Sequence, residues 1–207
     1  MSRNSVVDKP YLLMGEVNEK IFLDDLKKEF GYDIYKNKSY WSVIDFSSKI
    51  NKSSVEMKSR TCKYNSFENT MFGANKLTYA WNGIKNYGKR FFFVFAFTDG
   101  LYSWELTREN YELAGGDKMI YLDGTSERGV EDYKDHFHIP INQLKCISTK
   151  PSYVPPELQQ KKEKYDNDAS LSKNPAYKSV NASQAYDPKV WCKALKERKC
   201  LIDLTKV

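Results

Sequence analysis

The sequence predicts an α/β fold in which a central mixed β-sheet is flanked by helices. The clearest strand is Phe91–Phe97, a nearly unbroken apolar run that is typical of a strand covered on both faces in a mixed or parallel sheet. Two short β-rich runs around a polar turn, within Tyr40–Lys63, add a hairpin, and stretches with helical spacing precede and follow it. A chain of 207 residues is long enough to bury such a core.

The composition divides the chain into a core, residues 1–150, and a basic, partly helical C-terminal extension, residues 151–207. The 15 tyrosines and 11 phenylalanines exclude disorder of the whole chain, since they supply a large apolar surface to bury. The extension carries 11 lysines and arginines against 7 acids, which is most of the net charge of +6. This modest charge permits a polyanionic partner without requiring one.

Cysteine spacing favours neither a zinc site nor a disulfide framework, because no C-x-x-C pair occurs among Cys62, Cys146, Cys192 and Cys200. The first ten residues lack the apolar segment of a signal peptide, and no apolar run approaches membrane-spanning length. We therefore expect a reducing intracellular compartment, the cytoplasm or nucleus, and no membrane partner.

The first predicted helix spans Gly15–Phe30 and stops at Gly31. Its buried side is formed by apolar residues at helical spacing: Ile21, Phe22, Leu26 and Phe30. Glu16 and Glu19 share one side of its first turn, where the helix macrodipole favours acids even without a function. A loop, Tyr32–Ser39, is expected to follow.

The hairpin is predicted to pair strands Trp41–Ser47 and Ser54–Arg60 around a loop near Lys49–Lys52. A register that sets Phe46 opposite Val55 gathers the apolar side chains on one face: Ile44, Phe46, Val55 and Met57.

The other face of this hairpin then carries Asp45, Glu56 and Lys58, with Asp45 directly across from Glu56. Like charges across a strand pair are destabilising, so a compensating positive charge is needed. Lys58 supplies part of that charge, and a hard divalent cation bound by carboxylate oxygens would supply more.

A second helix is predicted from Thr70 to about Asn86. Its buried stripe consists of apolar residues: Leu77, Ala80, Trp81 and Ile84. The neighbouring face holds small residues around one lysine: Gly73, Lys76, Ala80 and Gly83. Either this face packs closely on a sheet beside a solvated lysine, or it directs Lys76 into a site.

After the strand Phe91–Phe97 the chain turns at Asp99-Gly100 and returns as the strand Leu101–Leu106. One face of the returning strand carries Tyr102, Trp104 and Leu106. Ala114–Arg128 is expected to be mostly turns, with a short strand at Met119–Leu122. Ile141–Ile147 is expected to be a short helix or strand.

His136 and His138 share a face of a predicted edge strand that Pro140 closes. Two imidazoles could hold a transition metal, but without a third ligand nearby the favoured roles are structural or at the surface. The extension is predicted to be a linker that contains one charged helix, Glu157–Tyr165, and a basic helix, Lys189–Lys199. Docking of that last helix on the core, contact with nucleic acid, and a homodimer or protein partner all remain open.

Asp45, ten intervening residues and then Glu56-Met57-Lys58 resemble the motif of the PD-(D/E)XK nucleases, in which an acid is followed by acid-x-Lys on the partner strand. Ile44 stands where the motif has proline. Gly15-x-x-x-Glu19-Lys20 resembles a helix motif of the resolvase-like members, and Asn75-Lys76-Leu77-Thr78-Tyr79 resembles their later helix. The order of hairpin, helix, buried strand and returning strand resembles their restriction-endonuclease-like core.

The resemblance implies a nuclease that depends on Mg²⁺ or Mn²⁺ and hydrolyses phosphodiester bonds of nucleic acid, with DNA favoured and weak sequence specificity. It implies these catalytic residues: Asp45, Glu56, Lys58 and Glu19, with Glu16 as a less favoured substitute for Glu19. The implied metal ligands are Asp45, Glu56 and the backbone carbonyl of Met57. The implied nucleic-acid contacts are Lys76, Arg60, Lys63 and Tyr79. Similar nucleases with Tyr- and Asn-rich sequences are carried by phages and large DNA viruses.

Two other interpretations stay open. The first is a protein of the same fold that has lost turnover and serves in nucleic-acid binding or assembly. The second is an unrelated α/β binding module in which the acid and acid-x-Lys pattern is coincidental. Convergence of Asp45, Glu56 and Lys58 in the folded chain would argue against the second.

Overall fold

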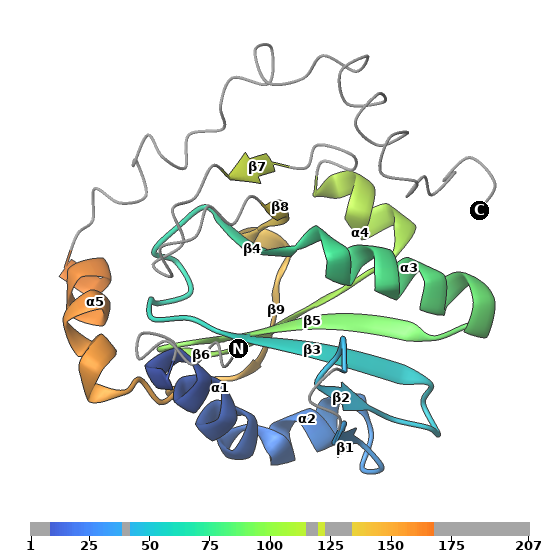
Figure 1. The fold of residues 1–207 in the computed structure, drawn as a ribbon, viewed down its shortest axis with the longest axis horizontal. Coiled ribbons are helices and arrows are strands. Elements are labelled where there is room, and N and C mark those ends of the chain that lie inside the picture. The colour runs from blue at the N-terminus through green and yellow to red at the C-terminus, as the bar shows by residue number, and fades with distance from the viewer. Residues whose placement is uncertain (1–8, 39–41, 115–119, 123–133, 168–207) are drawn as a thin grey trace, which may run out of the picture. The chain divides into compact units, whose positions relative to one another are not determined.

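The structure is a computed structural model, and it describes residues 9–38, 42–114, 120–122 and 134–167. Its centre is a six-stranded mixed sheet (Figure 1). In order across the sheet the strands are β1 (Tyr35–Lys36), β2 (Phe46–Ser47), β3 (Ser53–Ser59), β5 (Arg90–Phe97), β6 (Gly100–Glu105) and β9 (Lys145–Ser148). Only β3 and β5 are parallel, and the other neighbours are antiparallel.

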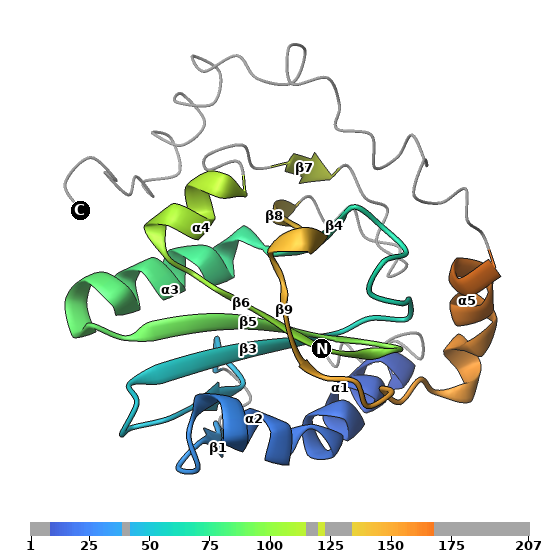
Figure 2. The same cartoon turned by 180° about the vertical axis from the view of Figure 1, so that it is seen from behind.

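Helices cover both faces of this sheet, which confirms the predicted α/β class. Two helices lie on one face, α1 (Lys9–Ile21) and α2 (Leu23–Phe30). On the other face lie α3 (Ala74–Tyr87) and the short α4 (Arg108–Leu113), as Figures 1 and 2 show from opposite sides. The parallel pair requires a crossover between β3 and β5, and α3 lies within it.

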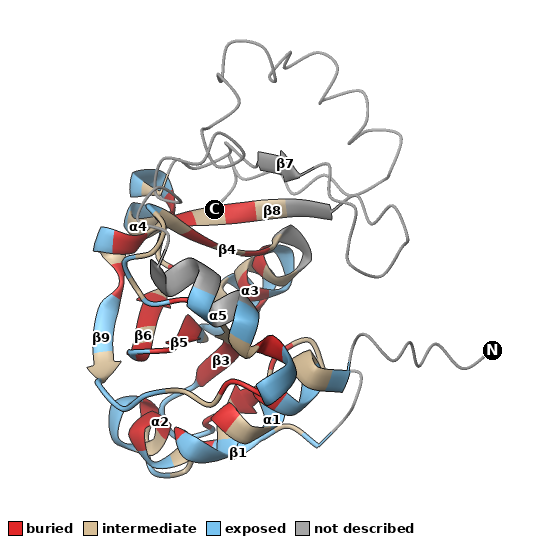
Figure 3. Cartoon of the chain, turned by 90° about the vertical axis from the view of Figure 1, so that its left-hand side faces the viewer, coloured by how far each residue is buried: buried red, intermediate tan, exposed pale blue. Residues whose placement is uncertain are grey.

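β5 is covered on both faces, as its continuous apolar run predicted. Phe91, Phe93, Phe95 and Phe97 pack in the cluster beneath α3. Phe92, Val94 and Ala96 pack in the cluster with α2. Figure 3 shows the buried residues concentrated on the strands between the two helical layers.

The first helical segment differs from the prediction because it starts earlier and is interrupted. α1 begins at Lys9, with Pro10 in its first turn, where proline costs no hydrogen bond. Tyr11 and Met14 of this added length pack on Val154 and Leu158 from the far end of the described chain. Glu16 therefore lies in the middle of the helix and Glu19 in its last turn, and the first turn holds no acid.

The hairpin has the predicted register but a shorter first strand. Phe46 pairs with Val55, as expected. β2 holds only Phe46 and Ser47, because the chain bends before it, with the Ser42 hydroxyl donating to the Ile44 carbonyl at 2.7 Å. The bend puts Ile44 in the cluster under α3, so the prediction that it shares a face with Phe46 is wrong. β1 lies in the segment that was expected to be a loop.

A second, antiparallel sheet has the order β4-β8-β7 and was not predicted. Its strands are β4 (Asn69–Gly73), β8 (Lys134–Pro140) and β7 (Ile120–Leu122). Thr70 is therefore in a strand, and the helix predicted to begin there starts at Ala74. The histidine strand β8 is central rather than an edge, because β4 pairs along it from Asn69 to Gly73. A 3₁₀ turn, Ile141–Gln143, leads from β8 to β9.

The chain after Pro151 is fastened to α1 before it enters α5 (Pro156–Asn167), which covers the predicted charged helix. Asn18, fully buried, accepts from the Tyr153 N–H at 2.6 Å and donates to the Tyr153 carbonyl and the Ser59 hydroxyl. The basic helix predicted at Lys189–Lys199 lies outside the described residues.

No helix among the described residues is long and apolar enough to cross a membrane. Cys62 and Cys146 carry free thiols, the first buried and the second exposed. The other two cysteines, Cys192 and Cys200, lie outside the part of the chain that the structure describes.

Candidate active site

Asp45 and Glu56 meet at the hairpin because the Phe46–Val55 register brings the bend before β2 alongside β3. The Asp45 backbone N–H donates to the Val55 carbonyl at 3.1 Å, which continues the strand pairing. One carboxylate oxygen of Asp45, Oδ2, accepts from the Met57 N–H at 2.7 Å. The Asp45 side chain thus accepts the Met57 N–H hydrogen bond that a backbone carbonyl of a paired strand would otherwise accept.

Glu56 carries a buried carboxylate that two lysines neutralise. Its side chain is 3% exposed, and its Oε1 lies 2.7 Å from the Lys58 Nζ and 3.0 Å from the Lys76 Nζ. Lys76 comes from the first turn of α3 and also donates to the Val43 carbonyl in the bend. The early position of Lys76 in the helix and its two acceptors direct its ammonium into the site.

The second oxygen of Glu56, Oε2, is buried and has no hydrogen-bond partner in the described part of the chain. A buried carboxylate oxygen without a partner is costly, and such an atom commonly marks the place of a water or an ion. Glu56 therefore offers one oxygen that the chain's own lysines leave available.

Asp45 is the least compensated charge of the site. Burial raises the pKa of Asp45 to about 6, and the negative charge of Glu56 adds to this rise. The Met57 N–H and the charge of Lys58 oppose it, while Glu19 raises the pKa of Asp45 further. The four residues that the sequence assigned to catalysis, Asp45, Glu56, Lys58 and Glu19, are therefore close enough to interact electrostatically.

Glu19 reaches the site from α1 and forms an ion pair with Lys36 of β1. This hydrogen bond raises the pKa of Lys36, with smaller contributions from the charges of Glu16 and Asp45. Lys36 could not be predicted from the sequence, since it lies in a two-residue strand without an apolar repeat and is one of 33 basic residues. Only the sheet pairing sets it opposite Glu19.

The residues fit a hard cation with few protein ligands. Asp45 and Glu56 supply carboxylate oxygens, and the Met57 carbonyl points to the same side of β3 as its N–H, toward Asp45. Mg²⁺ is often bound through one or two carboxylates and keeps several waters. Within the described ranges, no group of three or more His, Cys, Asp or Glu side chains is placed to hold a metal. A cation here would need water, or phosphate oxygens, to complete its coordination.

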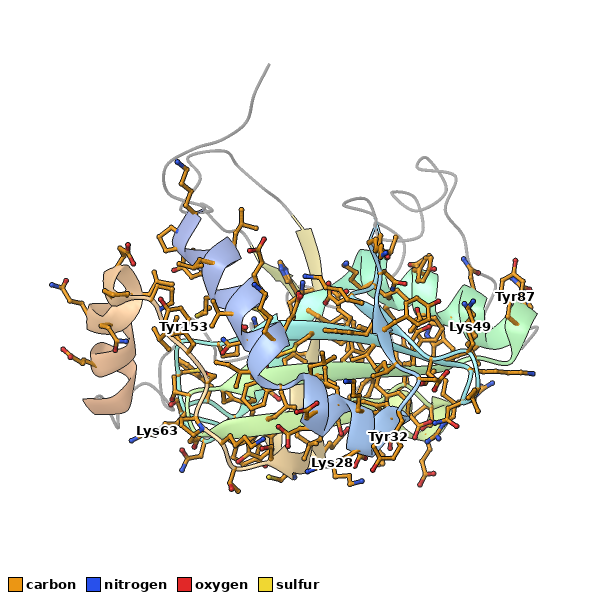
Figure 4. The ribbon with its side chains drawn as sticks, turned by 90° about the horizontal axis from the view of Figure 1, so that it is seen from below. Lys28, Tyr32, Lys49, Lys63, Tyr87 and Tyr153 are labelled. Atoms are coloured by element: carbon orange, nitrogen blue, oxygen red, sulfur yellow. The ribbon has the colours of Figure 1, made fainter. Side chains whose placement is uncertain are left out.

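The predicted nucleic-acid contacts are scattered. Arg60 is tied to β4, because it donates to the Thr70 hydroxyl at 3.3 Å and to the Met71 carbonyl and stacks over the Phe95 ring. Lys63 is exposed and lies at the opposite end of the molecule from Lys49 in Figure 4. Of these four residues, Lys76 contacts the acids directly, through Glu56.

Tyr79, the fourth of the predicted contacts, lies one turn beyond Lys76 on α3. Its ring is 40% exposed and its edge meets the Phe91 ring, with 6.0 Å between the centroids. A half-exposed ring fixed on one side is available for contact on the other.

The histidine pair lies on the outward face of the second sheet. Phe137 between them packs in the core, whereas His136 and His138 are half-buried. Burial, and then the charge of His136, lowers the pKa of His138 to about 4. The pair lies on β8, whereas the acids lie on and beside β3 in the other sheet.

Comparison of the chain with protein-family models, with curated proteins and with solved structures finds no match. The assignment of a function therefore depends on the geometry of the chain itself.

Proposed function

We propose that the protein is a metal-dependent nuclease that hydrolyses phosphodiester bonds of nucleic acid, with DNA as the favoured substrate and little sequence specificity. One observation carries the proposal. Two carboxylates, one with a raised pKa and one with an orphan buried oxygen, lie together with Lys58 and Lys76 at the hairpin. An acid with a perturbed pKa beside positioned lysines is typical of active sites.

The order of elements supports the same proposal. Helices α1 and α2, the meander β1-β2-β3, the crossover helix α3 and the parallel strand β5 follow one another along the chain. The acid-x-Lys sequence lies on β3, beside this crossover. That arrangement is what the resemblance to the PD-(D/E)XK nucleases requires.

Each residue has a distinct role in the proposed reaction. Asp45, Glu56 and the Met57 carbonyl would hold Mg²⁺ or Mn²⁺, which supplies charge stabilisation and an acidified water. Lys58, 2.7 Å from Glu56, would orient the attacking water. Lys76 would face a non-bridging oxygen of the phosphate and offset its developing charge. Glu19, paired with Lys36, adds negative charge beside Asp45.

The expected location is intracellular, in the cytoplasm or nucleus, and a virus or phage is the candidate source of the protein. The free thiols of Cys62 and Cys146 suit a reducing compartment. This location remains part of the proposal.

Nicking of supercoiled plasmid DNA tests the function. The wild-type protein should nick the plasmid in the presence of Mg²⁺ or Mn²⁺ and should be inactive in EDTA. Glu56→Gln keeps the shape of the buried side chain, and Lys58→Met keeps its length, so both should lose activity while remaining folded. Glu105→Gln is the matched control, because Glu105 pairs with Arg90 at 2.7 Å in an exposed ion pair. Equal activity of Glu56→Gln and wild type would sink the assignment.

A nucleic-acid-binding or assembly protein of the same fold without turnover is the second candidate. It is favoured by the two lysines that share one oxygen of Glu56, since they already neutralise the acid without a metal. DNA binding in EDTA together with no cleavage in either metal, at any pH above 6, would favour this candidate over the enzyme.

A further inference from the structure

We propose that the exposed face of α3 is the track on which the sugar–phosphate backbone of the substrate lies as it approaches Lys76. The inference rests on the proposed function, because it needs a nucleic-acid substrate, and it adds the path of that substrate over the protein. Three observations carry it: the side chains along α3, the absence of acids within α3, and the side of the sheet on which Glu56 lies.

The side chains of the track form one stripe on α3. Lys76, Tyr79, Asn82 and Asn86 follow one another at spacings of three and four residues, which places them side by side on a helix. The last three are exposed, whereas Leu77 and Ala80 of the same helix are in the core. The ten residue steps from Lys76 to Asn86 span about 15 Å, on the order of four base steps of duplex DNA.

The chemistry of the stripe fits a phosphodiester backbone. Asparagine, tyrosine and lysine side chains donate to phosphate and sugar oxygens, and such contacts position a nucleic acid without reading its sequence. Lys85 is exposed next to Asn82, and Lys89 follows the end of the helix with its Nζ 5.9 Å from the Tyr87 ring centroid. Tyr87 is itself 69% exposed. In Figure 4 it lies at the end of the molecule away from Lys63.

The charged residues of α3 itself have one sign. No aspartate or glutamate occurs between Glu68 and Asp99, and this interval contains α3 with its two lysines. On the other face of the sheet, α1 and α2 together carry five acids against four lysines. The neighbouring α4 lies on the same face as α3 and carries Glu109 and Glu112 beside Arg108, so the basic surface is that of α3 alone. A polyanion would therefore be attracted to α3 more than to the α1 and α2 face.

Glu56 lies on the same side of the sheet as α3. Glu56 alternates with Val55 and Met57, which pack in the cluster with α2, so the Glu56 side chain lies on the α3 side of β3. Its contact with Lys76 confirms that side. A backbone that follows the stripe from Asn86 to Lys76 thus ends at the acid cluster.

The salt dependence of DNA binding tests the track. A fluorescein-labelled duplex of mixed sequence is titrated with protein in EDTA at several salt concentrations, and the anisotropy gives Kd. The double variant Lys85→Ala, Lys89→Ala should weaken binding and reduce the slope of log Kd against log salt by about 2, one for each lost phosphate contact. The control double variant, Lys27→Ala, Lys28→Ala on α2, removes the same charge from the other face and should leave the slope unchanged.

A second variant tests the middle of the stripe without removing a lysine. Asn82→Asp places an acid on the exposed side of α3 and should weaken binding at low salt more than at high salt. The track is refuted if the α2 control changes the slope as much as the α3 variant, or if neither changes it. If only the α3 variants change DNA binding, and the protein does not cleave DNA under any condition, the track is supported and the proposed nuclease activity is refuted.

Discussion

Replacing Asp45 by asparagine should make the protein more stable at neutral pH while it abolishes cleavage. Asp45 is held in a place that disfavours its charge, since burial and the neighbouring Glu56 raise its pKa from 3.8 to about 6. Asparagine has nearly the same shape and keeps an oxygen to accept from the Met57 N–H, but it carries no charge. The variant removes the penalty and retains the hydrogen bond.

The size and the pH dependence of the gain follow from the pKa. In the folded protein Asp45 binds its proton more tightly than in the unfolded chain, so the wild-type stability falls as the pH rises from about 4 to about 6. At 1.36 kcal/mol for each tenfold change in proton affinity, the full penalty above pH 6 is about 3 kcal/mol. Water that reaches the partly buried carboxylate reduces this ceiling, so we expect a gain of about 1–3 kcal/mol.

Urea unfolding at pH 4 and pH 8 measures the gain. Asp45→Asn should raise the free energy of unfolding at pH 8 and leave it nearly unchanged at pH 4. Asp24→Asn is the control, because Asp24 is exposed on α2 and its change should stay within roughly 0.5 kcal/mol. If Asp45→Asn destabilises the protein at pH 8, or stabilises it equally at both pH values, the folded structure does not disfavour the charge of Asp45 and the argument is refuted.

The same carboxyl links metal binding to pH. With Mn²⁺ at a hundred times its Kd, the wild-type protein should gain about 2.7 kcal/mol at pH 8, and Asp45→Asn should gain little. With Mn²⁺ kept well below its Kd, cleavage by the wild type should fall about tenfold for each pH unit below 6, because the proton then displaces the cation from Asp45. Cleavage that does not change between pH 5 and pH 8 would exclude Asp45 from the essential ionised groups.

Two further predictions concern packing. Gly83→Ala should lower the free energy of unfolding by about 1–3 kcal/mol, because a Cβ there would lie 2.4 Å from the Phe91 ring. Gly15→Ala should instead stabilise α1 by roughly 0.5–1 kcal/mol, since nothing lies within 4 Å of a Cβ at that position. Thermal melts that rank the two variants in the other order would contradict this prediction. Asn18→Ala should lower the free energy of unfolding by about 2–3 kcal/mol, because the Tyr153 N–H and carbonyl lose their buried partner. The same variant should be cleaved faster by proteases beyond residue 150. An unchanged digestion rate would show that Asn18 does not hold this segment on α1.

The local pattern of the sequence determined several elements correctly. The apolar run of β5 and the alternation around Val55 reflect burial of side chains at a fixed period, and such a period can be read without knowing the partner strand. The register then followed from that alternation, and with it the placement of Asp45 near Glu56. The acid pair was predictable because its neighbours along the chain fix it.

Other features came from contacts between distant parts of the chain. β4 reads as the start of a helix until β8 pairs with it, and α1 extends back to Lys9 because Val154 and Leu158 cover its first turns. Lys36 has no local pattern at all. A contact between two segments that are far apart in the sequence produces no periodic spacing of apolar residues in either segment, so it cannot be predicted from the local pattern.

Sequence alone therefore determined that an acid and an acid-x-Lys would share one hairpin in an α/β fold. Strand alternation already placed Lys58 beside Glu56, and only the tertiary structure decided the other partners, namely Lys76 on Glu56 and Lys36 on Glu19. The physical reason is that a buried charge is stabilised by whichever opposite charge folding brings within a few ångströms, and β-strand alternation says nothing about a helix that crosses the sheet.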